Sequence, residues 1–123
     1  MFKMDEETGD AEAQQGDSWS FKVTGIPDDY TVYYSVYEID TREIIFEINT
    51  TPENEETTIE VTPVETDKLQ VEDGKKYKKY GYGIKRCKDG FEDTVIIGNK
   101  QIGEINVLKI YPKITEGAIN GQS

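Results

Sequence analysis

The segment 72–97 constrains the possible folds of this chain more than any other part of the sequence. It contains two Asp-Gly pairs, at positions 73–74 and 89–90, and an alternating run of side chains follows each pair. An Asp-Gly pair between two alternating runs is the strongest short-range signal for a β-hairpin, because glycine accepts the positive φ that such turns need. We therefore predict a long hairpin in which Tyr80, Tyr82 and Ile84 share one face of the first strand and residues 91–97 form the second strand.

Alternation of apolar and polar residues predicts further strands along most of the chain. Residues 18–24 alternate in the way that is typical of a half-buried strand. The same pattern predicts strands at about 30–39, 43–49 and 59–61, and a last strand that holds Ile105 and Val107 and could reach Ile110. Residues 64–69 could form one helical turn between two sheets, and no segment keeps the 3.6-residue period of a helix over ten residues.

These seven or eight short strands predict an all-β fold. With a turn signal every 8–12 residues, the pattern is typical of an antiparallel, immunoglobulin-like β-sandwich. The turn at Asp73-Gly74 and the tyrosine that follows it, Tyr77, resemble the corner where such domains place a tyrosine. One core between two sheets should hold the following side chains: Trp19, Phe21, Val23, Val32, Tyr34, Val36, Ile44, Phe46, Ile59, Val61, Tyr82, Ile84, Val95 and Ile97.

The length of 123 residues predicts a single domain. Residues 16–112 should form the sandwich, residues 113–123 a C-terminal tail, and residues 1–15 either a flexible acidic leader or a weak edge strand. The longest apolar run is only three residues long, so we expect no membrane-spanning segment and no membrane partner. The N-terminus lacks the apolar centre of a signal peptide. The single Cys87 excludes an internal disulfide, which fits a reducing compartment.

Charge is distributed unevenly along a chain whose net charge is −11. Residues 1–74 hold 20 acids and 4 bases, whereas residues 75–123 hold 5 acids and 10 bases. Either these charges only keep the surface solvated, or they form a bipolar surface for self-assembly or for a partner of opposite charge. The overall negative charge repels phosphates, so we expect no nucleic-acid partner.

A basic cluster at the start of the hairpin is the first candidate interface. It consists of four lysines: Lys75, Lys76, Lys78 and Lys79. Neighbours on a strand point to opposite faces, so both faces must be partly solvated here, or the strand must lie at a sheet edge, where lysines block uncontrolled pairing. This protective role stands against a binding role, in which the cluster contacts the acidic half of a neighbouring copy, head to tail.

Two tyrosines form the second candidate interface. Tyr33 and Tyr37 share one face of the strand predicted at 30–39. Tyrosine is favoured on half-buried strand surfaces, so these side chains could be purely structural. If their rings are exposed, they could instead form a platform for a sugar or for a protein partner.

The residue types that are present argue against an enzyme. The chain has no histidine, so it can form neither a Ser-His-Asp or Cys-His pair nor a histidine-based zinc site. Acidic pairs such as Asp28-Asp29 and Glu55-Glu56 are typical of solvated loops, and no segment has the spacing of a calcium-binding loop. We therefore expect no catalytic residues, no metal ligands and no cofactor.

The order of motifs over residues 15–110 resembles that of a known family. The motifs are Gly16-Asp17-Ser18-Trp19-Ser20-Phe21 before an early strand, Gly74-Lys75-Lys76-Tyr77 before the strand Tyr82-Gly83-Ile84-Lys85, and finally Thr94-Val95-Ile96-Ile97-Gly98. This order is similar to that of the immunoglobulin-like domain at the N-terminus of tailed-phage baseplate upper proteins and related prophage structural proteins. The Lys-Lys-Tyr-Lys-Lys-Tyr run at 75–80 departs from that family's pattern.

The resemblance implies a non-enzymatic phage or prophage structural protein. Such a protein would assemble with other virion or tail proteins, or with copies of itself, in a tail or baseplate. It would be located in the virion, or in the host cytoplasm during assembly. An alternative from a different class is a carbohydrate-binding or adhesin-like β-sandwich module that uses its loops or exposed tyrosines to bind a ligand.

Overall fold

The computed structural model describes residues 2–113, which fold into strands joined by loops and one short helix. The elements are β1 (Phe2–Met4), β2 (Ala11–Gln14), β3 (Trp19–Thr24), β4 (Thr31–Tyr37), β5 (Ile44–Thr50), β6 (Glu56–Val61), α1 (Pro63–Thr66), β7 (Lys78–Lys88), β8 (Phe91–Val95) and β9 (Asn106–Tyr111). The predicted all-β fold is therefore confirmed. The C-terminal tail predicted at 113–123 lies outside the described residues, except for Lys113.

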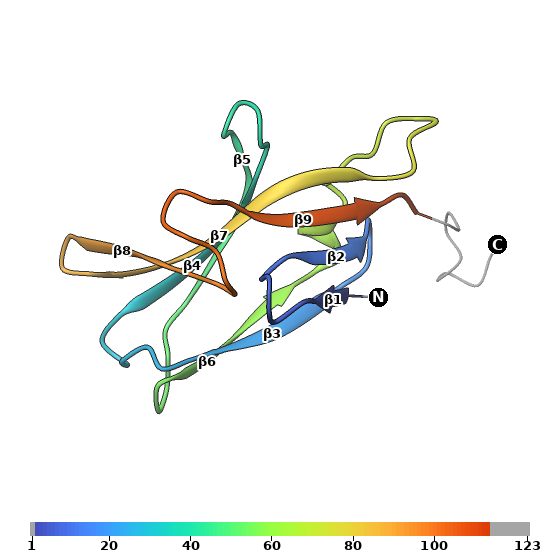
Figure 1. The fold of residues 1–123 in the computed structure, drawn as a ribbon. Coiled ribbons are helices and arrows are strands. Elements are labelled where there is room, and N and C mark those ends of the chain that lie inside the picture. Colours follow the sequence, from blue (N-terminus) through green and yellow to red (C-terminus); the bar gives the residue numbers. More distant parts are fainter. Residues whose placement is uncertain (1, 114–123) are drawn as a thin grey trace.

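The strands form two sheets that pack face to face (Figure 1). The large sheet has the order β1-β2-β9-β7-β4-β5, and β8 pairs with β7 beside β9. The small sheet is the antiparallel pair β3–β6. In an immunoglobulin-like sandwich, strands B and E lie in one sheet and strands C, F and G in the other. Here β3 and β6 take the places of B and E, and β4, β7 and β9 take the places of C, F and G.

The prediction of a purely antiparallel sandwich with seven or eight strands needs a correction. The described residues contain nine strands, and β2 pairs with β9 in parallel, with Ala11 opposite Leu108 and Ala13 opposite Ile110. The extra strands come from residues 2–14, where β1 forms an edge of the large sheet. Small residues with little apolar period still form strands here, because Ala11 and Ala13 are buried against the core.

The core between the sheets contains most of the predicted side chains. Val32, Tyr34 and Val36 on β4 are buried, and so are Tyr82 and Ile84 on β7. Aromatic rings join the two layers, since the rings of Phe21 and Tyr34 meet edge to face with their centroids 5.1 Å apart. Alternation along β3 holds as predicted, with Trp19 buried and the polar positions exposed.

The prediction that Ile44 belongs to the core is wrong. Its side chain is 54% exposed, although Phe46 two residues later is buried. The pairing of β4 with β5 shifts by one residue between Val36, which faces Phe46, and Tyr37, which faces Ile44. This β-bulge inserts Ile45 and reverses the alternation before it, so Ile44 turns to the side of the sheet that points away from the core.

The last strand, β9, alternates between a buried and a half-buried face. Asn106, Leu108 and Ile110 are buried, whereas Val107 lies on the opposite face. A polar residue occupies the first inward position because the side-chain amide of Asn106 donates to the carbonyl oxygens of Gly9 and Ile97, at 3.3 and 3.2 Å. A buried polar group that finds such acceptors escapes most of the cost of burial.

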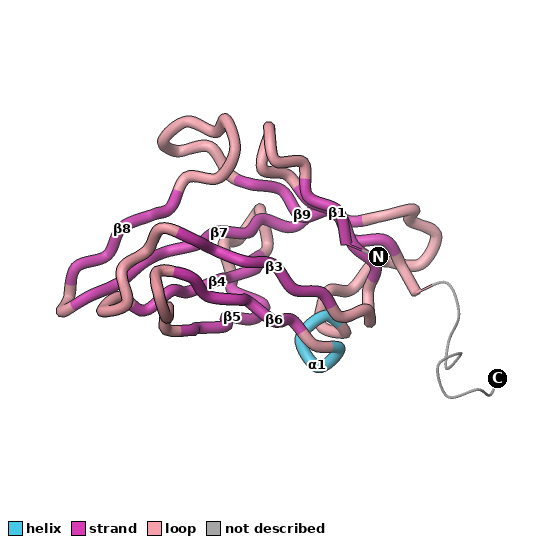
Figure 2. The backbone as a smooth tube through the Cα atoms, turned by 90° about the horizontal axis from the view of Figure 1, so that it is seen from below, coloured by secondary structure: helices cyan, strands magenta, loops and turns pink. Residues whose placement is uncertain are grey.

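The corner between the two sheets contains a helical turn and a buried tyrosine. The predicted turn is present as α1, and Glu65 accepts hydrogen bonds from both the backbone N–H and the hydroxyl of Thr62, at 2.9 and 2.6 Å. Figure 2 shows α1 after β6, where the chain leaves the small sheet. The corner tyrosine is Tyr80, whose hydroxyl donates to the Gln70 carbonyl at 2.6 Å. The tyrosine predicted for this role, Tyr77, is 43% exposed instead.

Candidate functional site

The face of the large sheet that points away from the small sheet is covered by no other element of the described chain, and we call it the outer face. Side chains alternate across a strand, so the neighbours of the buried residues reach this face. From β4 these are Tyr33, Ser35 and Tyr37, all half-buried. From β7 two glycines lie opposite them, because Gly81 pairs with Tyr37 and Gly83 with Ser35. The outer face therefore has open space above Gly83, with aromatic side chains on the neighbouring strand.

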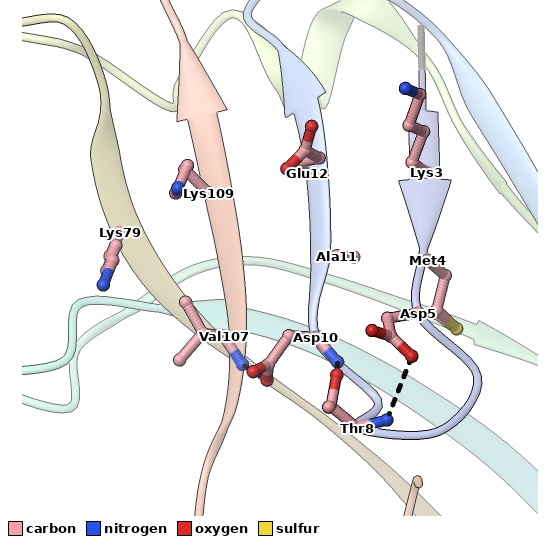
Figure 3. A pocket seen from close by; sticks show the side chains of 10 residues that line it. All are labelled: Lys3, Met4, Asp5, Thr8, Asp10, Ala11, Glu12, Lys79, Val107 and Lys109. Carbon is pink, nitrogen blue, oxygen red and sulfur yellow. Dashed lines mark hydrogen bonds between the residues drawn. The ribbon is translucent and has the colours of Figure 1, made fainter.

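A hollow of about 660 Å³ lies at one end of the outer face, over β1, β2, β9 and β7 (Figure 3). Four charged residues cross it in a row, one from each strand, and we call Lys3, Lys79 and Lys109 together with Glu12 the lysine row. The strand pairings place them side by side: Lys3 faces Glu12, Glu12 faces Lys109, and Lys109 faces Lys79. Because adjacent strands are about 4.8 Å apart, the row spans about 15 Å.

The lysine row has an excess of positive charge. Lys79 and Lys109 are directly opposite each other on neighbouring strands, an arrangement that is destabilising for like charges. No lysine of the row forms an ion pair with a residue that the structure describes. Lys109 lies instead 4.6 Å from the ring centroid of Tyr77, where the face of the ring attracts its ammonium group. Glu12 is therefore left to balance three cations.

Two further carboxylates line the hollow, but other partners already use them. Asp10 accepts a hydrogen bond from the backbone N–H of Val107 at 2.9 Å and forms an ion pair with Lys100 at 3.1 Å. Asp5 accepts the backbone N–H groups of Glu7 and Thr8, at 2.9 and 3.2 Å. Neither carboxylate forms an ion pair with a lysine of the row, so the excess of positive charge remains.

The basic cluster predicted from the sequence is divided by the fold. Lys78 points inward and forms an ion pair with Glu38 at 3.0 Å. Burial lowers the pKa of Lys78, but the hydrogen bond and charge of Glu38 outweigh it and raise the pKa overall. Lys75 and Lys76 are exposed in the turn before β7, and Lys79 alone joins the lysine row.

The protective role proposed for these lysines fits only the start of β7. Most of β7 is an inner strand, because it pairs with β4 on one side and with β9 and β8 on the other. Pairing with β4 begins at Gly81, so Lys78 and Lys79 have a neighbouring strand on the β9 side alone and lie at a local edge of the sheet. The alternative explanation, in which both faces of the strand start are partly solvated, agrees with the exposure of Lys79 and the partial exposure of Lys78.

The two tyrosines of the second candidate interface have different surroundings. Tyr37 lies across Gly81, where an added Cβ would come within 2.5 Å of the ring, and the guanidinium of Arg42 is 5.7 Å from its centroid. Tyr37 is thus held between these two groups. Tyr33 has no such contact among the described residues, and open space lies above Gly83 on the neighbouring strand. Both rings are half-buried, and of the two only Tyr37 has a glycine and a guanidinium group against its ring.

Beyond Lys79, the basic residues of the hairpin are neutralised locally. Lys85 forms an ion pair with Glu92 at 3.1 Å on one face of the hairpin, and Arg86 pairs with Asp93 at 2.9 Å on the other. Cross-strand pairs of this kind fix the register of β7 against β8. The local balance of charge leaves the lysine row as the positive feature of the outer face.

No group of three or more His, Cys, Asp or Glu side chains within residues 2–113 could hold a metal ion. No helix in this part of the chain is long and apolar enough to cross a membrane.

Sequence reasoning missed three of the four members of the lysine row. Lys3 and Lys109 are single lysines at the two ends of the described chain, and Glu12 sits in a segment with no clear strand pattern. The period-2 alternation of β9 could have placed Lys109 opposite the buried Leu108 and Ile110, but nothing local predicts its pairing with Lys79 or Glu12. Comparisons with protein-family models, with curated proteins and with solved structures found no match.

Proposed function

We propose that this chain is a non-enzymatic structural module that assembles with other subunits of a phage or prophage tail or baseplate through its outer face. The lysine row is the observation that supports an interface there most directly. Three cations that share one carboxylate, in a chain with a net charge of −11, are arranged to meet carboxylates supplied by another molecule. The uncovered centre of the same face provides contact area beside the row.

The family resemblance supplies the biological setting of this proposal. The motif order of residues 15–110 is similar to that of the immunoglobulin-like domain of baseplate upper proteins. The proposed location is accordingly the virion, or the host cytoplasm while the particle assembles. The proposed partners are virion or tail proteins, copies of this chain included, and neither nucleic acid nor a membrane.

Neighbouring genes provide the test. If portal, tape-measure and lysis genes surround the gene, each tail protein encoded there should be co-expressed with this chain and the pair purified. We expect at least one stable complex, weakened when Lys79 and Lys109 are both changed to Glu. The Lys75/Lys76→Glu variant, which changes charge equally outside the row, should keep the complex. A neighbourhood of carbohydrate-active enzymes, or no complex with any tail protein, would contradict the proposal.

A second candidate, a carbohydrate-binding or adhesin-like module, is favoured by Tyr33. Its ring lies on the outer face beside the open space above Gly83, and Asn49 faces it from β5. A half-buried aromatic ring can stack on a sugar ring through its exposed part, and a neighbouring amide can hydrogen bond to the hydroxyl groups of the sugar. Affinity electrophoresis in gels that contain neutral polysaccharides would test this function. Retardation that disappears in Tyr33→Ala, but not in Tyr77→Ala, would support it.

A further inference from the structure

The loop between β5 and β6 presents carboxylates at the acidic end of the molecule. Glu53 and Glu55 are exposed, and neither forms an ion pair within residues 2–113. Asp28 holds this loop, because its carboxylate accepts the backbone N–H groups of Asn54 and Glu55 at 3.0 and 2.7 Å. We call residues 53–55 the acidic loop. Its position is fixed by hydrogen bonds, so its two side chains reach solvent from a defined backbone.

The acidic loop and the lysine row lie at opposite ends of β7 (Figure 1). Lys79 is the second residue of this strand, and Lys88 is the last. Lys88 forms an ion pair with Asp29, the neighbour of the residue that holds the acidic loop. Nine residues of strand at about 3.3 Å per residue separate the two ends by about 30 Å. The loop of one copy therefore cannot reach its own lysine row, whereas the loop of another copy can.

On the basis of the function proposed above, we propose that copies of this chain associate head to tail, with the acidic loop of one copy on the lysine row of the next. Glu53 and Glu55 would supply carboxylate partners for Lys3, Lys79 and Lys109, which form no ion pair with a described residue of their own chain. The two patches are different, so the contact is heterologous and each added copy leaves both patches available at the ends. Association continues past the dimer and forms a ring or an open chain.

The net charge of −11 on each copy opposes this association at long range only. At physiological ionic strength, charges further apart than about 8 Å are largely screened from each other. The charges that meet in the contact lie closer than that and are screened much less. Association should therefore be present near 0.15 M salt and should weaken toward 1 M salt.

Charge reversal with rescue by mixing tests the proposal, with sedimentation velocity as the measurement. One variant reverses the lysine row, Lys79→Glu with Lys109→Glu, and the other reverses the acidic loop, Glu53→Lys with Glu55→Lys. For each variant alone, the dissociation constant of self-association should rise by about tenfold or more, because reversing one patch turns attraction into repulsion. An equimolar mixture of the two should associate again, since each reversed patch then meets its complement on the other variant.

Controls make the outcome decisive. Circular dichroism and thermal melting should show that both variants are folded. The Lys75/Lys76→Glu variant has the same charge change as the row variant and should associate like the wild type. A mixture that stays monomeric, or a control that dissociates as much as the row variant, would overturn the proposal. A wild type that is monomeric but binds a tail protein from a neighbouring gene would overturn it as well, while leaving the proposed function intact.

Discussion

Phe46 and Ile44 lie two positions apart on β5, yet only Phe46 contributes to the core, because the bulge at Ile45 separates their faces. Phe46→Ala should lower the free energy of unfolding by about 3–5 kcal/mol, since it removes a buried aromatic ring and leaves a cavity. Ile44→Ala should change it by less than about 0.5 kcal/mol, as is usual at exposed positions. Urea unfolding of both variants measures the difference. Equal losses in the two variants would show that the bulge is absent in solution.

Burial of three tyrosines makes stability depend on alkaline pH. Burial raises the pKa of Tyr34 and of Tyr80, and burial together with the charge of Asp10 raises the pKa of Tyr82. Below pH 10, where tyrosine is protonated in the unfolded chain, these side chains add no pH dependence. Above pH 10 the unfolded chain loses these protons more readily than the folded chain, so the free energy of unfolding falls as the pH rises.

Urea unfolding at pH 9 and at pH 11 should show this loss. Each buried tyrosine should contribute at most about 1.4 kcal/mol per pH unit. Tyr82→Phe removes one of these groups and should make the fall between these pH values less steep, even though it also removes the hydrogen bond from the Tyr82 hydroxyl to the Gly9 carbonyl. An equally steep fall in Tyr82→Phe would show that this side chain does not carry the pH dependence.

At the scale of elements, the loop after β8 holds the N-terminal hairpin β1–β2 in place. The backbone N–H of Asn99 donates to the Glu7 carbonyl at 2.8 Å, and Gly98 contacts the backbone of Thr8. Gly98 has a φ of +70°, and a Cβ there would approach the Thr8 backbone to 2.3 Å. The position therefore needs glycine both for its conformation and for the close approach of two segments.

Gly98→Ala should thus loosen the N-terminal hairpin. Gly90→Ala is the matched control, because Gly90 also has a positive φ, +83°, but a Cβ there would meet no atom within 4 Å. Both variants carry the conformational cost of about 1 kcal/mol, and the clash should make Gly98→Ala the less stable of the two. Hydrogen exchange should show faster exchange of the amides of β1 and β2 in Gly98→Ala only. Unchanged exchange there would contradict the docking of this hairpin.

At the scale of the whole molecule, the residue types predict that the protein does not catalyse hydrolysis. It has no histidine, and carboxylates such as those of Asp28 and Asp10 are engaged by backbone amides or by a lysine. Glycoside, ester and phosphate substrates should therefore give rates equal to those of a buffer control. Turnover that is lost when a single carboxylate is changed to its amide would contradict this prediction.

Local pattern was sufficient to predict the strands and their main inward faces. Alternation placed Val32, Tyr34 and Val36 in the core, and the Asp-Gly pair at 89–90 predicted the β7–β8 hairpin correctly, because both signals lie within a few neighbouring residues. The corner tyrosine was predicted three residues too early, at Tyr77 instead of Tyr80. Both tyrosines follow the same turn signal, and only the fold decides that Tyr80 is buried and reaches the Gln70 carbonyl.

Only the tertiary structure decided the candidate site. The lysine row depends on the parallel pairing of β2 with β9, which brings Glu12 opposite Lys109, and on the pairing of β9 with β7, which brings Lys109 opposite Lys79. The sequence by itself determined that the chain is an all-β protein with an acidic first part and a basic hairpin. Strand order and register decided which charges lie side by side. Both follow from the burial of apolar faces against each other, here Ala11 and Ala13 with Leu108 and Ile110, and no local signal in the sequence predicts them.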